Sequence, residues 1–219
     1  MVISLLQPCL IPDLDYLARI FKSDRVFIAD TDRFSRKGRI NRWQIRVPEG
    51  SQWMNIPIMT ADRSKSIREV RIDHARLKPA KLMYSLELNY RNSIYFDHYQ
   101  PEIAADFEAA TGYEFLCDYI SYINGRLFEF LDISFEADYL SHSAFENLHP
   151  DAISEAMGAS AVYQERASVN FQIQATRKQE PDFTHPAYRQ HFEGFVPHCC
   201  LLDILFAYGP TSFQILDKL

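Results

Sequence analysis

The first thirty residues constrain the fold more than any other part of the chain, because apolar runs and a helical pattern alternate there. Residues 2–7 read as a strand that ends in the proline-bounded loop "QPCLIP" at 7–12. Asp13 can then cap a helix over 14–21, whose apolar residues share one face, and "RVFIAD" at 25–30 is a second buried strand. A unit of this length predicts two neighbouring, parallel, central strands with a right-handed crossover.

The loop at 7–12 lies where α/β sheets bind ligands. In open parallel sheets, ligands bind beyond the carboxyl ends of the strands. Gln7 leaves the first strand at this end, and Asp30 and Asp32 leave the second strand toward the same edge. The loop is therefore either the start of a site or a plain strand end that proline terminates.

The chain as a whole predicts an α/β fold in a single domain over residues 1–219. Its mixed sheet opens with a parallel β-α-β unit, and a helical segment of three helices fills about 79–131 in mid-chain. An antiparallel hairpin is expected at 40–58. The other expected elements are strands at 66–73, 132–140 and 167–175, a short helix at 150–158, and a helix at 199–208 that Gly209 and Pro210 stop, followed by a capping box of Thr211 and Gln214.

Glycine spacing and charge exclude several functions. The seven glycines are scattered, so no glycine-rich loop for a dinucleotide or a nucleoside triphosphate can form. The formal charge of −6 argues against a nucleic-acid partner, whose binding footprint is basic. No apolar run approaches the ~20 residues of a membrane span. Four cysteines without C-x-x-C spacing fit free thiols, and a cytoplasmic protein is expected.

A basic run interrupts this acidic chain. "RFSRKGRINRWQIR" at 33–46 holds Lys37 and five arginines, among them Arg42. Arginine forks bind carboxylates and phosphates in two parallel bonds, so the run is either an anion site or a solvated loop. If 40–47 is a strand, Asn41 lies on the face of its apolar residues, and Arg42 and Arg46 lie on the other face.

Histidines near the C-terminus are a second group of candidates. His185, His191 and His198 have spacings that match no zinc pattern, so no metal is expected. His185 could act alone as a general acid or base, because its ordinary pKa lies near neutrality. Cys200 could be a reactive thiolate at a helix start, or it could form a capping box with Asp203.

Motifs at both ends of the chain occur in a distinctive order. The front carries Q-P…P, N-R and W…P, a middle stretch reads "LELNYRNSIYFDHY", and the back carries F-x-P…D-x-L-F…G-P. The end motifs fall on Gln7, Pro8, Pro12, Asn41, Arg42, Trp53, Pro57, Phe195, Pro197, Asp203, Phe206, Gly209 and Pro210. In this order they resemble the WbqC-like protein family of bacteria.

Several positions depart from the family pattern, as in a divergent or specialised member. A histidine often precedes the Q-P, a tyrosine follows it, an aromatic residue and a glycine follow the second proline, and a serine starts the C-terminal helix. This chain instead has Leu6, Leu10, Asp13, Asp15 and Cys200.

The resemblance implies a small-group transferase that moves an aminoacyl or acyl group onto an amino sugar or related small molecule. The implied setting is bacterial surface polysaccharide, such as O-antigen, or secondary biosynthesis, with an activated acyl donor and no cofactor. His185 would be the base, while Arg42 and Gln7 would position the donor or its oxyanion. We expect these three side chains to meet within about 10 Å of a common point. The expected substrate-binding residues are Asn41, Trp53, Lys37, Tyr188 and Asp203.

Two alternatives stay open. A non-catalytic binding or scaffold protein of a biosynthetic complex would show an exposed aromatic patch and no enclosed polar pocket. A nucleotidyl-type transferase is disfavoured, because no H-x-x-H follows the first strand. The sequence also leaves open a homodimer.

The histidine spacing leads to a first prediction. Elemental analysis of the purified protein should find neither zinc nor iron in stoichiometric amount, because no ligand set with metal spacing is present. One metal ion per chain would contradict this interpretation of the C-terminal histidines.

Overall fold

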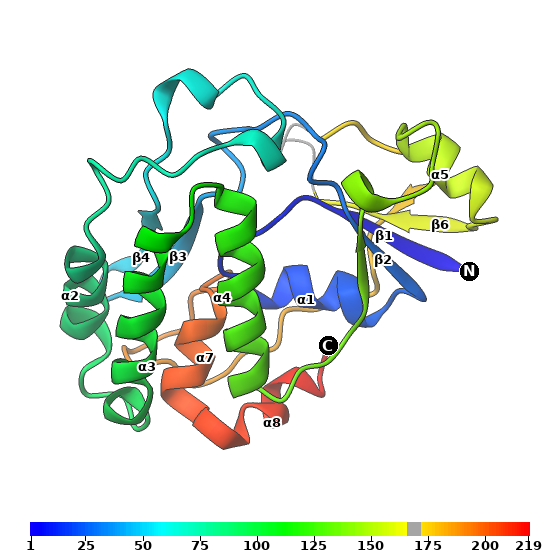
Figure 1. Ribbon diagram of the computed structural model, residues 1–219. Coiled ribbons are helices and arrows are strands. Elements are labelled where there is room, and N and C mark those ends of the chain that lie inside the picture. The colour runs from blue at the N-terminus through cyan, green and yellow to red at the C-terminus, as the bar shows by residue number, and fades with distance from the viewer. Residues whose placement is uncertain (166–171) are drawn as a thin grey trace.

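The computed structural model describes residues 1–165 and 172–219 and has two halves (Figure 1). The first half is a parallel sheet centred on the N-terminal strand. Its strands are β1 (Val2–Leu6), β2 (Arg25–Ile28), β5 (Ala137–Tyr139), β6 (Ala161–Tyr163) and β7 (Lys178–Gln179). They run in the order β5-β2-β1-β6-β7, and every pairing is parallel. The predicted parallel and central placement of the first two strands is confirmed, since each has a neighbour on both sides.

Both faces of the central strand are covered, which explains its apolar sequence. Ile3 and Leu5 pack with residues of β2 and of helix α5 (Pro150–Ala156). Leu6 instead packs with α1 (Leu14–Phe21), the crossover helix between β1 and β2. Ser4 is the polar exception, and its hydroxyl is satisfied because it donates to the Arg19 carbonyl of α1 at 2.7 Å.

The second half is helical and packs around a hairpin. Figure 1 shows this half on the opposite side of α1 from the parallel sheet. Its elements are β3 (Arg42–Val47), β4 (Gly50–Asn55), α2 (Pro79–Tyr90), α3 (Phe96–Ala109), α4 (Leu116–Phe130), α7 (Leu201–Tyr208) and α8 (Phe213–Leu216). The predicted α/β class, the antiparallel hairpin and the helical segment are confirmed. The hairpin forms its own two-stranded sheet, so parallel and antiparallel strands occupy two sheets.

The strand predicted at 66–73 is wrong. A 3-10 helix (Ile67–Glu69) occupies it, and single bridges follow at Arg71 and Ile72. The cause is the buried Asp62 carboxylate, which accepts hydrogen bonds from both the backbone N–H and the guanidinium of Arg71. Because Lys65 also pairs with Asp62, the chain turns around the Asp62 carboxylate instead of extending along a sheet.

The other expected strands have mixed outcomes. The strand expected at 132–140 is present as β5, and the expected short helix is α5. Part of the strand expected at 167–175 lies outside the described residues, and 172–175 carry no strand. Within the described ranges, no helix combines the length and the apolar character needed to cross a membrane.

Both predicted capping boxes are wrong. Thr211 donates its hydroxyl to the Tyr208 carbonyl, and Ser212 takes the N-cap position of α8. Cys200 is the N-cap residue of α7, but among the described residues its thiol makes no cap hydrogen bond. The Asp203 carboxylate instead accepts hydrogen bonds from the side chains of Tyr188 and Gln190.

Gly209 ends α7 as predicted, and its position leads to a second prediction. Its φ is +50°, and a Cβ there would lie 2.6 Å from the ring of Tyr95. Gly209→Ala should therefore lower the free energy of unfolding by roughly 2 to 4 kcal/mol, as measured by urea denaturation.

Gly125→Ala is the matched control. Gly125 lies within α4, and an added Cβ would meet nothing within 4 Å. Alanine there should raise stability by roughly 0.5 to 1 kcal/mol. Equal effects of the two substitutions would contradict the steric explanation.

Candidate functional site

The order of strands creates a switch point between β1 and β6. From β1 the chain builds β2 and β5 on one side, then β6 and β7 on the other. In open parallel sheets, the crevice beyond the carboxyl ends of such a strand pair is the usual place for a ligand. Gln7 follows β1 at this point, and Glu165 follows β6. They are in direct contact, because the Gln7 backbone N–H donates to the Glu165 carboxylate at 3.1 Å.

Gln7 holds the strand ends together. Pro8 supplies no backbone donor, so the sheet ladder stops and the Gln7 side chain turns inward. Its amide nitrogen donates to Asp32 at 2.9 Å, and its backbone carbonyl accepts from the Tyr16 hydroxyl at 3.0 Å. Its buried amide oxygen has no partner among the described residues. Gln7 therefore joins the ends of β1, β2 and β6, and its side-chain oxygen can still accept a hydrogen bond.

Glu165 is a buried carboxyl at this edge of the sheet. Burial raises its pKa to about 7, although the Gln7 N–H and the charges of Arg39 and Arg19 act in the opposite direction. A carboxyl with such a pKa can accept and release a proton near neutral pH. Glu165 is not among the residues predicted from the sequence, because the strand before it, "AVY" at 161–163, is only three residues long and has no recognisable pattern.

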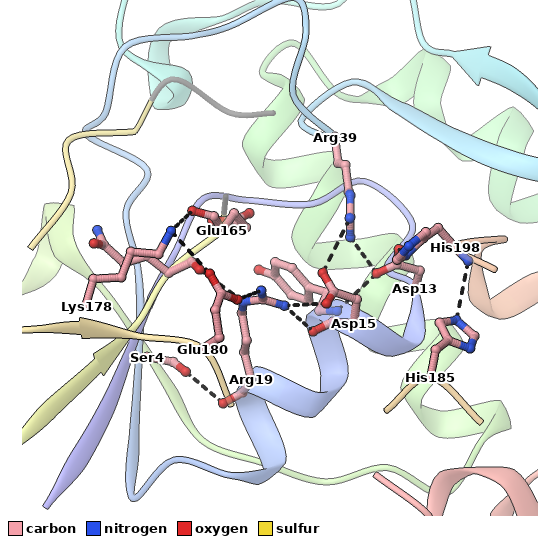
Figure 2. A network of polar contacts seen from close by, with 12 residues as sticks. Ser4, Asp13, Asp15, Arg19, Arg39, Glu165, Lys178, Glu180, His185 and His198 are labelled. Atoms are coloured by element: carbon pink, nitrogen blue, oxygen red, sulfur yellow. Dashed lines mark hydrogen bonds and ion pairs between the residues drawn. The ribbon is translucent and has the colours of Figure 1, made fainter. Parts of the chain in front are cut away.

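A network of ion pairs lies at the carboxyl edge of the sheet and reaches the backbone of Glu165 (Figure 2). Arg39 binds Asp13 at 2.5 Å and Asp15 at 3.5 Å, and Arg19 binds Asp15 at 2.8 Å. Arg19 also binds Glu180, which pairs with Lys178. Lys178 in turn donates to the Glu165 carbonyl. The buried or half-buried side chains of Asp13, Asp15, Arg19 and Arg39 are each compensated by an opposite charge, as burial in protein requires, whereas Glu165 has no ion-pair partner among the described residues.

Asp13 anchors the network at the start of α1. Its carboxylate accepts from the Tyr16 N–H at 3.0 Å, which caps the helix. Burial opposes ionisation of Asp13, but Arg39, His198 and the Tyr16 N–H together hold its pKa below the ordinary value. Asp13 is therefore a permanent negative charge, unlike Glu165.

His198 lies beside Asp13, and His185 contacts His198 in turn. His198 Nδ1 lies 3.6 Å from the Asp13 carboxylate, and the His198 backbone N–H donates to His185 Nε2 at 3.3 Å. His185 Nδ1 lies 3.1 Å from the Pro186 carbonyl. Burial lowers the pKa of His185, so this ring is neutral at neutral pH. Both of its nitrogens have protein partners, and its role as a base stays a prediction.

Tyr188 and Asp203 meet each other in the interior. The Tyr188 hydroxyl donates to Asp203 at 2.8 Å, and the Gln190 amide donates to the same carboxylate oxygen at 2.9 Å. Burial raises the pKa of Asp203. This contact ties the segment before α7 to the helix itself, and substrate binding by either residue stays a prediction.

A separate pocket beside the hairpin has Asn41, Arg42 and Trp53 among its lining residues. The Arg42 guanidinium lies 4.0 Å from the centre of the Trp53 ring, and it donates to the Gly38 and Lys37 carbonyls. Lys37 thus contributes at least its backbone to this group. Gln7, Arg42 and His185 each bind different neighbours, and their convergence on one point stays a prediction.

The surroundings of the cysteines disfavour thiolate formation. Cys9, Cys117, Cys199 and Cys200 are free and buried. Burial raises the pKa of Cys200 well above its ordinary value, so the interpretation of Cys200 as a reactive thiolate is wrong. In the part of the chain that the structure describes, no three His, Cys, Asp or Glu side chains are grouped to hold a metal ion.

The fold defines an α/β protein with a network of buried polar side chains at the carboxyl edge of a parallel sheet. The model of the WbqC-like protein family matches residues 7–215, and the chain therefore belongs to this family. No curated protein and no solved structure is matched by the sequence.

The raised pKa of Glu165 leads to a third prediction. The unfolded chain ionises this group near pH 4.5 and the folded protein near pH 7, so its contribution to stability is complete below pH 4.5 and is lost as the pH rises through 7. Glu165→Gln should therefore exceed the wild type in unfolding free energy by ~3 kcal/mol at pH 8, with a difference that shrinks toward pH 4.5.

Chemical denaturation across this pH range measures the effect. Glu155→Gln is the control, because Glu155 is an exposed residue of α5 and its neutralisation should leave the wild-type pH profile unchanged. A stability difference for Glu165→Gln that does not vary with pH would contradict the raised pKa.

Proposed function

We propose that this protein is a small-group transferase that moves an aminoacyl or acyl group onto the amine of an amino sugar or related small molecule. The setting we propose is bacterial surface-polysaccharide synthesis, such as that of O-antigen, or secondary biosynthesis. The observation that carries the proposal is the contact between Gln7 and Glu165 at the switch point. Membership of the WbqC-like family supports it.

Transfer to an amine needs a base, and Glu165 suits this role. The amine nitrogen attacks the activated carbonyl carbon, a C–N bond forms, and the nitrogen gives up a proton to the Glu165 carboxylate. The bond from the carbonyl carbon to the leaving group then breaks with its electron pair, and Glu165 returns the proton to the leaving group. A pKa near 7 lets one carboxyl perform both steps.

The tetrahedral intermediate carries an oxyanion that donors must stabilise. Gln7 uses one amide N–H for Asp32, and an amide nitrogen carries two hydrogens. The second N–H and the positive charges of Arg39 and Arg19, which act on Glu165, would favour the developing negative charge. We therefore propose for Gln7 the oxyanion-stabilising role that the sequence predicts.

We assign the base to Glu165 instead of His185 because the imidazole is already engaged. His185 Nε2 accepts from the His198 backbone, and Nδ1 faces the Pro186 carbonyl. His185 would then support Asp13 through His198. We also propose that the reaction takes place in the cytoplasm, since four buried free thiols suit a reducing compartment.

A fourth prediction tests the proposed reaction. The protein is incubated with acyl and aminoacyl thioesters and a set of nucleotide-linked amino sugars, and mass spectrometry follows the acceptor. The wild type should add the mass of the acyl group to one acceptor. Glu165→Gln should slow this transfer roughly 10²- to 10⁴-fold, the usual contribution of a general base.

Glu155→Gln should retain wild-type activity, because its carboxyl is exposed on α5. An acceptor that binds tightly without any transfer would favour the non-catalytic binding or scaffold alternative. Full activity in Glu165→Gln would remove Glu165 from the mechanism.

A further inference from the structure

A pocket rich in arginine lies beside the hairpin. Its cavity volume is about 280 Å³, and arginines from three segments surround it. Arg36 comes from the loop before β3, Arg42 begins β3, and Arg63 and Arg76 come from the connection between β4 and α2. Trp53, Asn41 and Asn55 supply an aromatic face and amides. Four cations therefore gather at one cavity of a chain whose formal charge is −6.

Opposite charge does not neutralise this cluster. Arg76 pairs with Asp73 at 2.6 Å, and it also donates to the Ile58 carbonyl. Among the described residues, Arg36, Arg42 and Arg63 have no carboxylate within ion-pair distance, and no acidic residue lines the pocket. Three uncompensated guanidinium groups around one cavity repel each other, and an anion would relieve this repulsion.

One of these arginines is already held in place. The Arg42 guanidinium stacks on Trp53, and two backbone carbonyls fix its other edge. Such a group loses little conformational freedom when it binds an anion, because its position is set beforehand. Arg36 and Arg63 are exposed, so they can move toward a bound group.

We infer that this pocket binds the phosphate group of a ligand the size of a sugar phosphate. A carboxylate offers two oxygens, whereas a terminal phosphate offers three and can take forks from several arginines at once. The cavity lies just below the ~300 Å³ of typical drug-sized sites, which suits a phosphate with one sugar ring. The free side-chain oxygen of Asn41, whose Nδ2 donates to the Ile56 carbonyl, can accept from a sugar hydroxyl.

This inference goes beyond the proposed function and does not depend on it. Phosphate binding here needs no proton transfer by Glu165. It does give the proposed transferase a means to hold a phosphorylated acceptor or donor. The binding experiment below uses no transfer reaction, so its failure would leave the proposed function standing.

A fifth prediction tests the phosphate site by titration. The chain has two tryptophans, of which Trp43 is 1% exposed and Trp53 is 41% exposed, so ligand at the pocket should change the fluorescence of Trp53. Pyrophosphate and a hexose 1-phosphate should both bind. The double variant Arg36→Ala with Arg63→Ala should weaken both affinities at least ~10-fold, because charge-assisted hydrogen bonds are lost.

Arg91→Ala is the control for net charge. Arg91 is exposed at the end of α2 and does not line the pocket, so its removal should leave both affinities unchanged. Inorganic phosphate is titrated in the same way. Tighter binding of the hexose phosphate than of inorganic phosphate would identify a phosphorylated sugar as the ligand, and equal binding would identify the free ion. Calorimetry and thermal unfolding of each variant verify the affinities and the fold.

Three results would overturn the inference. The first is the absence of phosphate binding by the wild type. The second is equal binding of malonate, a dicarboxylate, since the site would then recognise charge alone. The third is an equal loss of affinity in Arg91→Ala, which would assign the effect to the overall charge of the protein.

Discussion

The ion pair between Asp13 and Arg39 joins the parts of this structure that the sequence keeps separate. Asp13 caps α1, so the charge is fixed to the crossover of the first parallel unit. Arg39 belongs to the loop before β3, and the backbone at Asp13 bridges to Cys200 before α7. A buried charge that loses its partner is costly, typically by 3 to 5 kcal/mol. The loop after β1, the hairpin and the C-terminal helix are therefore held in one arrangement around the switch point.

Local patterns were sufficient to predict the elements whose burial is simple. The opening unit, the hairpin and the helices over 79–131 each present an apolar face with a clear period, and the structure contains them. The segment at 66–73 has the alternation of a strand. Arg71 of this segment nevertheless donates hydrogen bonds to the buried Asp62 carboxylate, and the segment does not extend along a sheet. A carboxylate nine residues before Arg71 decided the conformation, and the alternation of apolar and charged residues does not reveal such a partner.

The site illustrates the same limit over longer separations. Gln7 was found from the sequence because proline marks the end of a strand, a local event. Its partner Glu165 lies 158 residues further along the chain, and only the strand order brings the two together. Asn41, Arg42 and Trp53 are close in a hairpin, so their meeting follows from the local fold. His185 is linked to Asp13 through His198, a contact that depends on tertiary packing.

The two polar regions of the molecule obey different electrostatic rules. At the carboxyl edge of the sheet, Asp13, Arg39, Asp15, Arg19 and Glu180 alternate in charge and form ion pairs with one another, so the network stabilises its own geometry. Glu165 differs from the other acids there, because burial outweighs the arginine charges and raises its pKa to about 7. At the hairpin, guanidinium groups face solvent without carboxylates on the pocket wall. A folded chain gains nothing from that repulsion, and the arrangement becomes favourable once an anion enters the pocket. The polar residues at the sheet edge thus form a network of paired charges, whereas the pocket at the hairpin carries positive charge that no lining carboxylate of the described residues offsets.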